Sequence, residues 1–521
     1  MIELQALYVP IIFILSLVVS SRLFLERQRK RAPYPPGPTP KPVIGNALDI
    51  PLEKSWKKYM EWSKQFNSGI IHLSALNTHI VILNTMEDIV ELMEKRSANY
   101  SDRPSLKIFN ILGASVMTGF LPYGPTWKTH RRLMDEALKK DVLPSYHHIF
   151  SGKVHLLLDQ FLHKPDSFRE HIDELGASIT MAIAFGYDVT PGVQDHFVEP
   201  AEFALNTGAG LIIPGRTLLV VFGFLCYIPP WIPGASTQRL CADAKEAIML
   251  TREGPYQYVK HKMDVGSSKD CVLARVLERD SGDLGFIEDK ELLKNIMASF
   301  YFGGVETMKA SMANFMLAMT LNTRAQKKAQ DEIDSIVGSH RLPSYEDRAS
   351  LPYVEALYRE VHRWRPIVPT SLAHATTRDD VYKGYYIPKG TIILSNIWAI
   401  SRNEDNYPDP DSFSPERFLN LDGTLNDDTV SYAFGFGRRI CPGRYMADKV
   451  VWLMIVTVLA TFNISKARDG TGNEIDIDPD AYTDGITSHP LPFKCSIICR
   501  SEQAESLIRK ASEVAWKDLA K

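Results

Sequence analysis

Residues 434–444, Phe-Gly-Phe-Gly-Arg-Arg-Ile-Cys-Pro-Gly-Arg, place one cysteine, Cys441, in a glycine-rich turn before an apolar run over residues 445–459. A helix N-terminus carries unpaired N–H groups and the positive end of the helix dipole, and both stabilise a thiolate. Pro442 suits the first helical position, where its missing N–H costs nothing. Glycines let the backbone turn tightly and approach a flat ligand closely. The stretch therefore predicts a single thiolate at a helix start, beneath something large and planar.

The alternative for a lone cysteine is a free thiol buried before a core helix, because cysteine is among the most buried residue types. The wider pattern argues against it. The spacing Phe-x-x-Gly-x-Arg-x-Cys-x-Gly resembles the haem-ligand signature of the cytochromes P-450, and it is matched by Phe434, Gly437, Arg439, Cys441 and Gly443. The resemblance implies haem b as cofactor, with the Cys441 thiolate as the axial ligand of its iron and Phe434 and Arg439 beside it. The amides of Gly443 and Arg444 are then the candidates to hydrogen-bond the sulfur.

The composition is that of a large globular protein. The chain has 521 residues, of which 45% are hydrophobic and 23% charged, with a formal net charge of −3. No flexible linker follows residue 45, so we expect one domain over residues 46–521. The near-neutral charge argues against nucleic acid as a partner. The six cysteines are scattered rather than arranged as a disulfide framework, which fits a reducing compartment.

The N-terminus predicts a membrane anchor over residues 1–31. Residues 4–25 are almost all apolar, about the length that crosses a bilayer as a helix. A cleaved signal peptide is the alternative, but the first charge is the acidic Glu3 and no small-residue cleavage site stands out. Five basic residues follow at once: Arg22, Arg27, Arg29, Lys30 and Arg31. The positive-inside rule then leaves the rest of the chain in the cytosol.

Residues 32–45 form a proline-rich hinge. Six prolines lie between residues 33 and 42, so this stretch is stiff and cannot be helical. It predicts a spacer between anchor and body and resembles the hinge of microsomal cytochromes P-450. A binding site for a partner that recognises proline-rich segments is the alternative.

Residues 218–234 are the most apolar internal run. Pro229, Pro230 and Pro233 interrupt it, so it is not a second membrane span. In the resembling family this position is the lid loop over the substrate channel. Its aromatic residues either dip into the membrane surface or pack in the core: Phe222, Phe224, Tyr227 and Trp231.

The resemblance runs from about residue 33 to about residue 500 and implies a mainly α protein with small β-sheets, the cytochrome P-450 fold, preceded by a transmembrane helix. Local patterns predict a helix over residues 53–66, two strands over residues 70–83 around a turn near Asn77, and a helix over residues 86–96.

A second block of the same family lies in a long helical pattern over residues 292–321. It contains Gly303-Gly304-Val-Glu306-Thr307, and two glycines inside a helix cost about 1 kcal/mol each relative to alanine. The alternative is two helices that meet at Gly303. The block resembles the family motif Ala/Gly-Gly-x-Asp/Glu-Thr, which implies that Gly303 and Gly304 let the helix lie against the haem. Thr307 would then offer a hydroxyl to bound O2, and Glu306 would carry protons inward.

Further residues resemble the family's haem-binding and structural positions. Trp127 and Arg131 match its Trp-x-x-x-Arg block, whose residues meet a haem propionate, and Arg439 and His374 stand where further propionate donors occur. A surface arginine on an aromatic ring and a structural histidine are the plainer alternatives. An ion-pair network that fixes the thiolate loop is implied for Glu360, Arg363 and Arg417, the family's Glu-x-x-Arg and Pro-Glu-Arg-Phe residues.

The resemblance implies a monooxygenase of the endoplasmic reticulum membrane with a cytosolic catalytic domain. NADPH–cytochrome P-450 reductase would supply electrons, with cytochrome b5 as a further donor, because the chain has no flavin or nicotinamide domain. The basic residues expected to meet the reductase are Lys128, Arg132, Lys139 and Lys140.

The sequence texture is most like mushroom enzymes of secondary metabolism, in the stretches 81–84, 100–103 and 489–495. By family position, residues 109–120, 300–304, 368–372 and 486–487 line the substrate pocket. They are apolar and partly aromatic, which favours a terpenoid over an indole amine or a polyketide. A haem-thiolate isomerase or dehydratase that does not activate O2, or a haem sensor, is the other alternative, and the Glu306–Thr307 pair argues against these.

Overall fold

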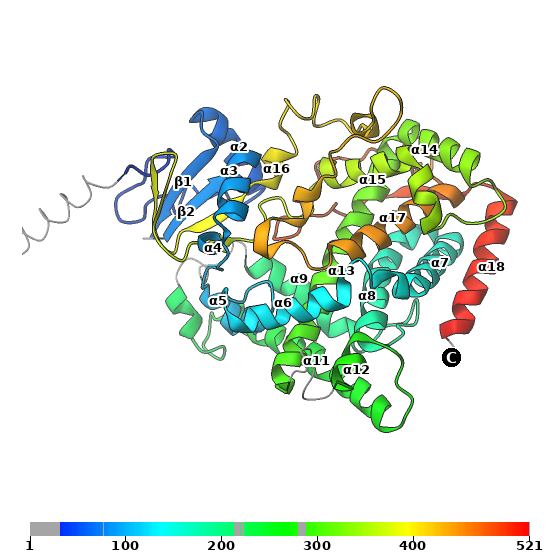
Figure 1. Cartoon of the computed structure of the whole chain (residues 1–521), viewed down its shortest axis with the longest axis horizontal. Coiled ribbons are helices and arrows are strands. Elements are labelled where there is room, and N and C mark those ends of the chain that lie inside the picture. Colours follow the sequence, from blue (N-terminus) through cyan, green and yellow to red (C-terminus); the bar gives the residue numbers. More distant parts are fainter. Residues whose placement is uncertain (1–31, 77, 213–218, 220–222, 280–287, 520–521) are drawn as a thin grey trace, which may run out of the picture.

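The computed structural model describes residues 32–76, 78–212, 219, 223–279 and 288–519. The predicted anchor over residues 1–31 and the turn residue Asn77 lie outside these ranges. Among the described residues, no helix is long and apolar enough to cross a membrane. The predicted class is confirmed for the described residues, which are mainly helical with small sheets (Figure 1).

The main sheet lies to one side of the helices, at the left of Figure 1. Its strand order is β1-β2-β6-β3; β2 runs antiparallel to β1 and parallel to β6. Strands β1 and β2 confirm the predicted pair over residues 70–83. Their apolar residues bury one face against α2, Ser55–Gln65, which confirms the helix predicted over residues 53–66. The strands are β1 Ile70–Ala75, β2 Thr78–Leu83, β3 His374–Ala375, β4 Asp380–Tyr382, β5 Tyr385–Ile387, β6 Ile392–Ser395, β7 Phe462–Lys466 and β8 Cys495–Cys499.

The helices make up the rest of the molecule. The prediction over residues 86–96 is confirmed as a short α-helix that continues into a π-helical turn, η1. The other helices are α3 Met86–Ile89, η1 Val90–Lys95, α4 Ser97–Tyr100, α5 Lys107–Ile111, α6 Pro125–Leu138, α7 His147–His163, α8 Phe168–Phe185, α9 Val198–Leu211, α11 Ser236–Asp264, α12 Val272–Leu277, α13 Lys290–Leu321, α14 Thr323–Ile336, α15 Pro352–Trp364, α16 Ile397–Ile400, α17 Arg444–Thr461 and α18 Glu502–Leu519.

Helix α13 runs through the middle of the helical part (Figure 1). The helix predicted over residues 292–321 is therefore confirmed in one piece, without a break at Gly303. Its first turn is capped by Asp289, whose carboxylate accepts from the amides of Glu291 at 2.9 Å and Leu292 at 3.1 Å. Most of its residues are buried in the main hydrophobic core. The two glycines thus sit inside a helix that packing on several sides stabilises.

The proline-rich hinge packs against the sheet rather than crossing solvent as a free spacer. The carbonyl oxygens of Pro33 and Pro36 accept from the amides of Tyr386 at 2.8 Å and His72 at 2.9 Å. The Tyr34 ring stacks on His72 with centroids 4.7 Å apart. Because proline carbonyls remain free acceptors, a stretch that cannot form a helix can still bond to neighbouring strands.

The described part of the apolar run 218–234 is a short 3₁₀ turn, η5 Gly223–Tyr227, followed by the proline segment. Of the aromatic residues for which membrane contact and core packing were both open, Tyr227 and Trp231 are 72% and 78% exposed, and Phe222 lies outside the described residues. Cys226, directly before Tyr227, is buried. This segment therefore presents large apolar side chains to the outside while one small thiol faces the core.

Candidate active site

The loop that carries Cys441 is held in shape by its own backbone. The amide of Cys441 donates to the carbonyl of Phe434 at 2.9 Å. Gly437 has a φ of +55°, and a Cβ there would lie 2.1 Å from the carbonyl oxygen of Met93 in η1. This glycine is therefore needed for contact with η1 rather than for contact with a flat ligand.

Helix α17 begins at Arg444, with Gly443 as its N-cap. Pro442 thus lies before the helix, and its prediction as the first helical residue was wrong. The backbone amides of Gly443 and Arg444 act to lower the pKa of the Cys441 thiol, the direction predicted from the sequence. Burial nevertheless dominates and raises the pKa of the Cys441 thiol above its ordinary value. The protein alone therefore favours the neutral thiol, and a bound metal cation is what would deprotonate it.

A cluster of cationic side chains lies beside this loop. Arg439 donates from Nε to the Ser101 carbonyl at 2.8 Å and from Nη2 to the Leu121 carbonyl at 2.9 Å, and its guanidinium lies 4.3 Å from the Trp127 ring centroid. Its Nη1 is buried and has no hydrogen-bond partner among the residues that the structure describes. Burial lowers the pKa of Arg439 to about 10.

Arg103 belongs to the same cluster, although no site role was predicted for it from the sequence. It donates from Nη1 to the carbonyls of Leu372 and Ala373, both at 2.7 Å, and its Nε is buried without a partner. Burial and the charge of Arg439 lower the pKa of Arg103 to about 9. The Asp102 carboxylate acts to raise both pKa values but does not outweigh burial, so a further anion at the two guanidiniums would be favourable.

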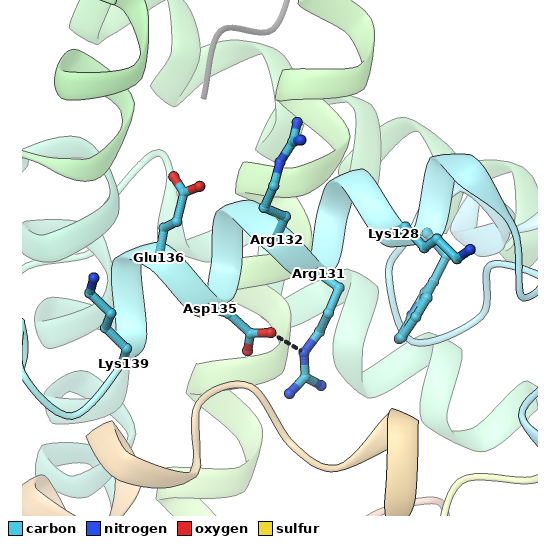
Figure 2. A pocket seen from close by; sticks show the side chains of 7 residues that line it. Lys128, Arg131, Arg132, Asp135, Glu136 and Lys139 are labelled. Atoms are coloured by element: carbon cyan, nitrogen blue, oxygen red, sulfur yellow. Dashed lines mark hydrogen bonds and ion pairs between the residues drawn. The ribbon is translucent and has the colours of Figure 1, made fainter. Parts of the chain in front are cut away.

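His374 and Arg131 complete the cluster. His374 Nδ1 lies 2.7 Å from the Tyr100 carbonyl, so Nδ1 is the protonated nitrogen of the neutral ring. Burial, with the charges of Arg103 and Arg439, holds the pKa of His374 well below its ordinary value. Arg131 pairs with Asp135 at 2.8 Å on α6 (Figure 2). It also donates to the Ile440 carbonyl. The structure thus gathers Trp127, Arg131, His374 and Arg439, as the sequence proposed.

These residues fit a haem. The unpartnered N–H groups of Arg103 and Arg439 call for acceptors, which the two propionates of a haem would provide. Cys441 lies in the adjoining loop and offers one sulfur to the iron. Phe434, in the same loop, is half-buried, with its ring centroid 5.8 Å from that of His362.

The two glycines of α13 have different surroundings. A Cβ at Gly304 would meet Thr180 Oγ1 of α8 at 3.0 Å, so Gly304 serves close helix packing rather than a planar ligand. A Cβ at Gly303 would meet nothing within 4 Å, which fits the expected contact with the haem. Thr307 Oγ donates to the Gly303 carbonyl at 2.9 Å. Of the two glycines, therefore, only Gly303 has the open space that contact with a haem would require.

Glu306 lies against the segment 483–490. Its Oε1 is 3.4 Å from His489 Nε2 and 3.4 Å from Thr487 Oγ1. Burial acts to raise the pKa of Glu306, but the hydrogen bond from His489 and the charge of Lys309 outweigh it, and the pKa is lowered. Sequence reasoning missed His489 as a partner, because the two residues are far apart in the chain.

A channel of about 150 Å³ lies between the sheet side and the helices. It includes Phe109 and Phe120, whose rings stack with centroids 4.2 Å apart, together with residues 370–372 and Ile486. These lie within three of the four segments expected to form the pocket, whereas residues 300–304 do not line this channel. One acidic residue, Asp484, lines it too, and its Oδ1 accepts from the Lys54 amide at 2.7 Å.

The ion-pair network of Glu360, Arg363 and Arg417 is present. Arg363 contacts both carboxylate oxygens of Glu360, at 2.6 and 2.8 Å, and both side chains are fully buried. Arg417 Nε lies 3.2 Å from Glu360 Oε1, and the Ser414 amide donates to the same oxygen at 2.7 Å. The network joins α15 to the segment that precedes the Cys441 loop.

Comparison with known proteins gives one consistent result. The family model described as Cytochrome P450 matches residues 35–497. Cytochrome P450 monooxygenase 98 of Postia placenta is 36% identical over 491 residues, which cover 93% of this chain and 94% of the relative. Cytochrome P450 monooxygenase ple1 of Rhodocybe pseudopiperita is 36% identical, with 93% of each chain covered. Cytochrome P450 monooxygenase COX2 of Coprinopsis cinerea is 36% identical, with 92% of each covered.

Proposed function

The chain belongs to the cytochrome P-450 family of haem-thiolate monooxygenases, and from this premise we propose that it hydroxylates a hydrocarbon-rich small molecule of the terpenoid class in fungal secondary metabolism. The channel carries the substrate proposal. Its lining is mostly aliphatic and aromatic, and the stacked pair of Phe109 and Phe120 offers a flat apolar wall. Burial of apolar surface is the main source of affinity for such a ligand.

The haem, when bound, supplies O2 activation and transfer of one oxygen atom. Cys441 would hold its iron, and the cluster of Arg103, Arg131, His374 and Arg439, with Trp127, would hold its propionates. On α13, the Thr307 hydroxyl and the Glu306 carboxylate would hold and pass the protons that the oxygen chemistry of the haem consumes.

An indole amine is the second candidate substrate, because Asp484 lines the channel. A carboxylate there could pair with an ammonium group. Its Oδ1 already accepts from the Lys54 amide, however, so an amine would have to share or replace that bond.

A spin-state titration of the purified ferric protein tests the two candidates. A bicyclic terpene should displace the water on the haem iron and shift the protein from low to high spin, in the parent and in Asp484→Asn alike. A shift with an indole amine alone, lost in Asp484→Asn, would contradict the terpenoid proposal and support an alkaloid substrate.

The proposed electron donor is a membrane-bound NADPH–cytochrome P-450 reductase, with cytochrome b5 as a further donor. On α6, Lys128, Arg132 and Lys139 are exposed, and Arg131 and Arg132 point to opposite sides of the helix (Figure 2). The acidic neighbours Asp135 and Glu136 are paired with Arg131 and Arg279. Arg132→Glu should therefore raise the reductase concentration that gives half-maximal turnover, more strongly at low salt.

We place the protein at the endoplasmic reticulum membrane with its catalytic domain in the cytosol. The apolar residues 4–25 and the basic residues after them support this, and the exposed Tyr227 and Trp231 suit a bilayer surface. Removal of residues 1–31 should release most of the protein from membranes in low salt. Retention in the parent's proportion, after Tyr227 and Trp231 are also replaced by serine, would contradict the anchor.

A further inference from the structure

His489 lies between the carboxylate of Glu306 on α13 and the guanidinium of Arg169 on α8. Its Nε2 faces Glu306 Oε1 at 3.4 Å, and its Nδ1 lies 3.3 Å from Arg169 Nη2. Both Glu306 and His489 are largely buried, with 17% and 16% of their side chains exposed. Leu491, two residues after His489, is exposed, so the segment that carries His489 reaches the surface.

The Nδ1 atom has one partner for each of its protonation states. Arg169 can only donate, so it bonds the bare Nδ1 of the neutral ring and leaves the proton on Nε2, facing Glu306. The Pro490 carbonyl, which can only accept a hydrogen bond, also lies 3.3 Å from Nδ1. It would accept a hydrogen bond from Nδ1 when that nitrogen carries a proton. The ring is thus able to take a proton at one nitrogen while it holds another at the opposite nitrogen.

We propose that His489 is the relay that passes protons from solvent to Glu306, and that Arg169 returns it to the tautomer that can do so. The proposal rests on the proposed oxygenase function of Glu306 and Thr307. A proton arrives at Nδ1 and is held by the Pro490 carbonyl, and the proton on Nε2 moves to Glu306 Oε1. Arg169 then favours release of the Nδ1 proton to solvent, and solvent returns a proton to Nε2, so each cycle delivers one net proton to Glu306.

The reaction requires such a supply. Hydroxylation of a C–H bond by O2 consumes two electrons, delivered from NADPH by the reductase, and two protons, and it releases one water. Each turnover therefore draws two protons to a region where Glu306 and His489 are largely buried. With hydrogen peroxide in place of O2 and NADPH, the same product and one water form without any added proton or electron.

The other charged groups near this path lie on α8, α9 and α13. Lys309 of α13 pairs with Asp173 of α8 at 2.8 Å, and Glu202 of α9 lies near that pair. Burial raises the pKa of Asp173 and of Glu202. Within the part of the chain that the structure describes, Asp173 and Glu202 make no hydrogen bond or ion pair with His489, so the histidine is the group that joins Glu306 to the outer segment.

Three variants test the relay in the holoenzyme. His489→Gln keeps an N–H donor for Glu306 but carries no transferable proton, His489→Ala removes both, and His340→Gln changes a histidine in an exposed loop. The first two should lower product per NADPH by about tenfold, with a larger solvent deuterium isotope effect and more peroxide released. His340→Gln should match the parent. If His489→Gln also matches the parent, the residue only positions Glu306 and the relay is overturned.

Two further measurements separate the relay from other causes. Product formed from added hydrogen peroxide should stay within about twofold of the parent in His489→Gln, because that reaction needs no proton supply. An equal loss with peroxide would mean that the substituted loop misplaces the substrate, which overturns the relay.

Infrared spectra of the resting protein give a readout without turnover. The Glu306 carboxylate band, assigned with Glu306→Gln, should titrate at a higher pH in His489→Ala, because a hydrogen bond that lowers the pKa has been removed. An unchanged titration would show that the two groups do not interact and would overturn the relay. Glu306→Gln also separates the two proposals: if it keeps the parent's product per NADPH, the role of Glu306 itself fails, whereas loss there with a parent-like His489→Gln defeats only the relay.

Discussion

The two sides of the site differ in how tightly the protein specifies them. On the thiolate side, Cys441 sits in a loop braced by short hydrogen bonds and by the fully buried pair of Glu360 and Arg363. On the α13 side, Glu306 makes contacts of 3.4 Å and remains partly exposed. A metal ligand has to be fixed, whereas groups that hand on protons have to exchange partners. The difference therefore separates the part that we propose holds the cofactor from the part that we propose passes protons.

Cys441→Ala should have the largest effect of any single change on the thiolate side. It removes the only ligand that the loop offers to iron, so the red-shifted ferrous–CO band of thiolate haem should disappear and hydroxylation should stop. The measurement is the CO difference spectrum of the purified protein. Cys499→Ala, at a half-buried thiol of β8, is the matched control and should keep the band. A band retained in Cys441→Ala would sink the ligand assignment.

Glu360→Gln should be the next most severe, although it lies away from the haem. It leaves Arg363 fully buried without its carboxylate, which costs about 3–5 kcal/mol in unfolding free energy. The unfolding free energy measured with denaturant and the haem content per chain should both fall. Glu505→Gln, in an exposed pair with Arg509, should change stability by less than about 1 kcal/mol. Similar stabilities for the two variants would show that the network does not brace the loop.

Thr307→Ala tests the α13 side of the site. It removes a hydroxyl that donates to the Gly303 carbonyl and leaves the fold intact, so stability and the CO band should be unchanged. Product per NADPH should fall by about tenfold while peroxide rises, because protons no longer reach the bound oxygen in time. Ser311→Ala removes a similar helix-to-carbonyl hydroxyl one turn further along α13 and serves as control. An unchanged product yield in Thr307→Ala would remove the residue from the proton path.

The same contrast explains what could be predicted from the sequence. The thiolate loop, α13 and the Glu360–Arg363 pair are set by local spacing, so motifs along the chain were enough to find them. Arg103 and His489 were missed because their partners, at residues 372–373 and 306, come from segments far away in sequence. The periodicity of a local sequence segment carries no information about contacts with distant segments. The direction of the thiol pKa in the protein alone could not be predicted for a related reason. The helix N-terminus is visible in the sequence, but the burial that outweighs it is not.

Gly303→Ala and Gly304→Ala should show the smallest effects and the finest distinction. A Cβ at Gly303 meets nothing within 4 Å, so alanine there should stabilise α13 by up to about 1 kcal/mol through its helix propensity. A Cβ at Gly304 meets Thr180 Oγ1 at 3.0 Å, and that contact with α8 should cancel the same gain or reverse it. Denaturant unfolding of the two variants in parallel measures the difference. If Gly304→Ala is the more stable variant, α8 and α13 are free to move apart, and the close packing inferred for this side of the site is wrong.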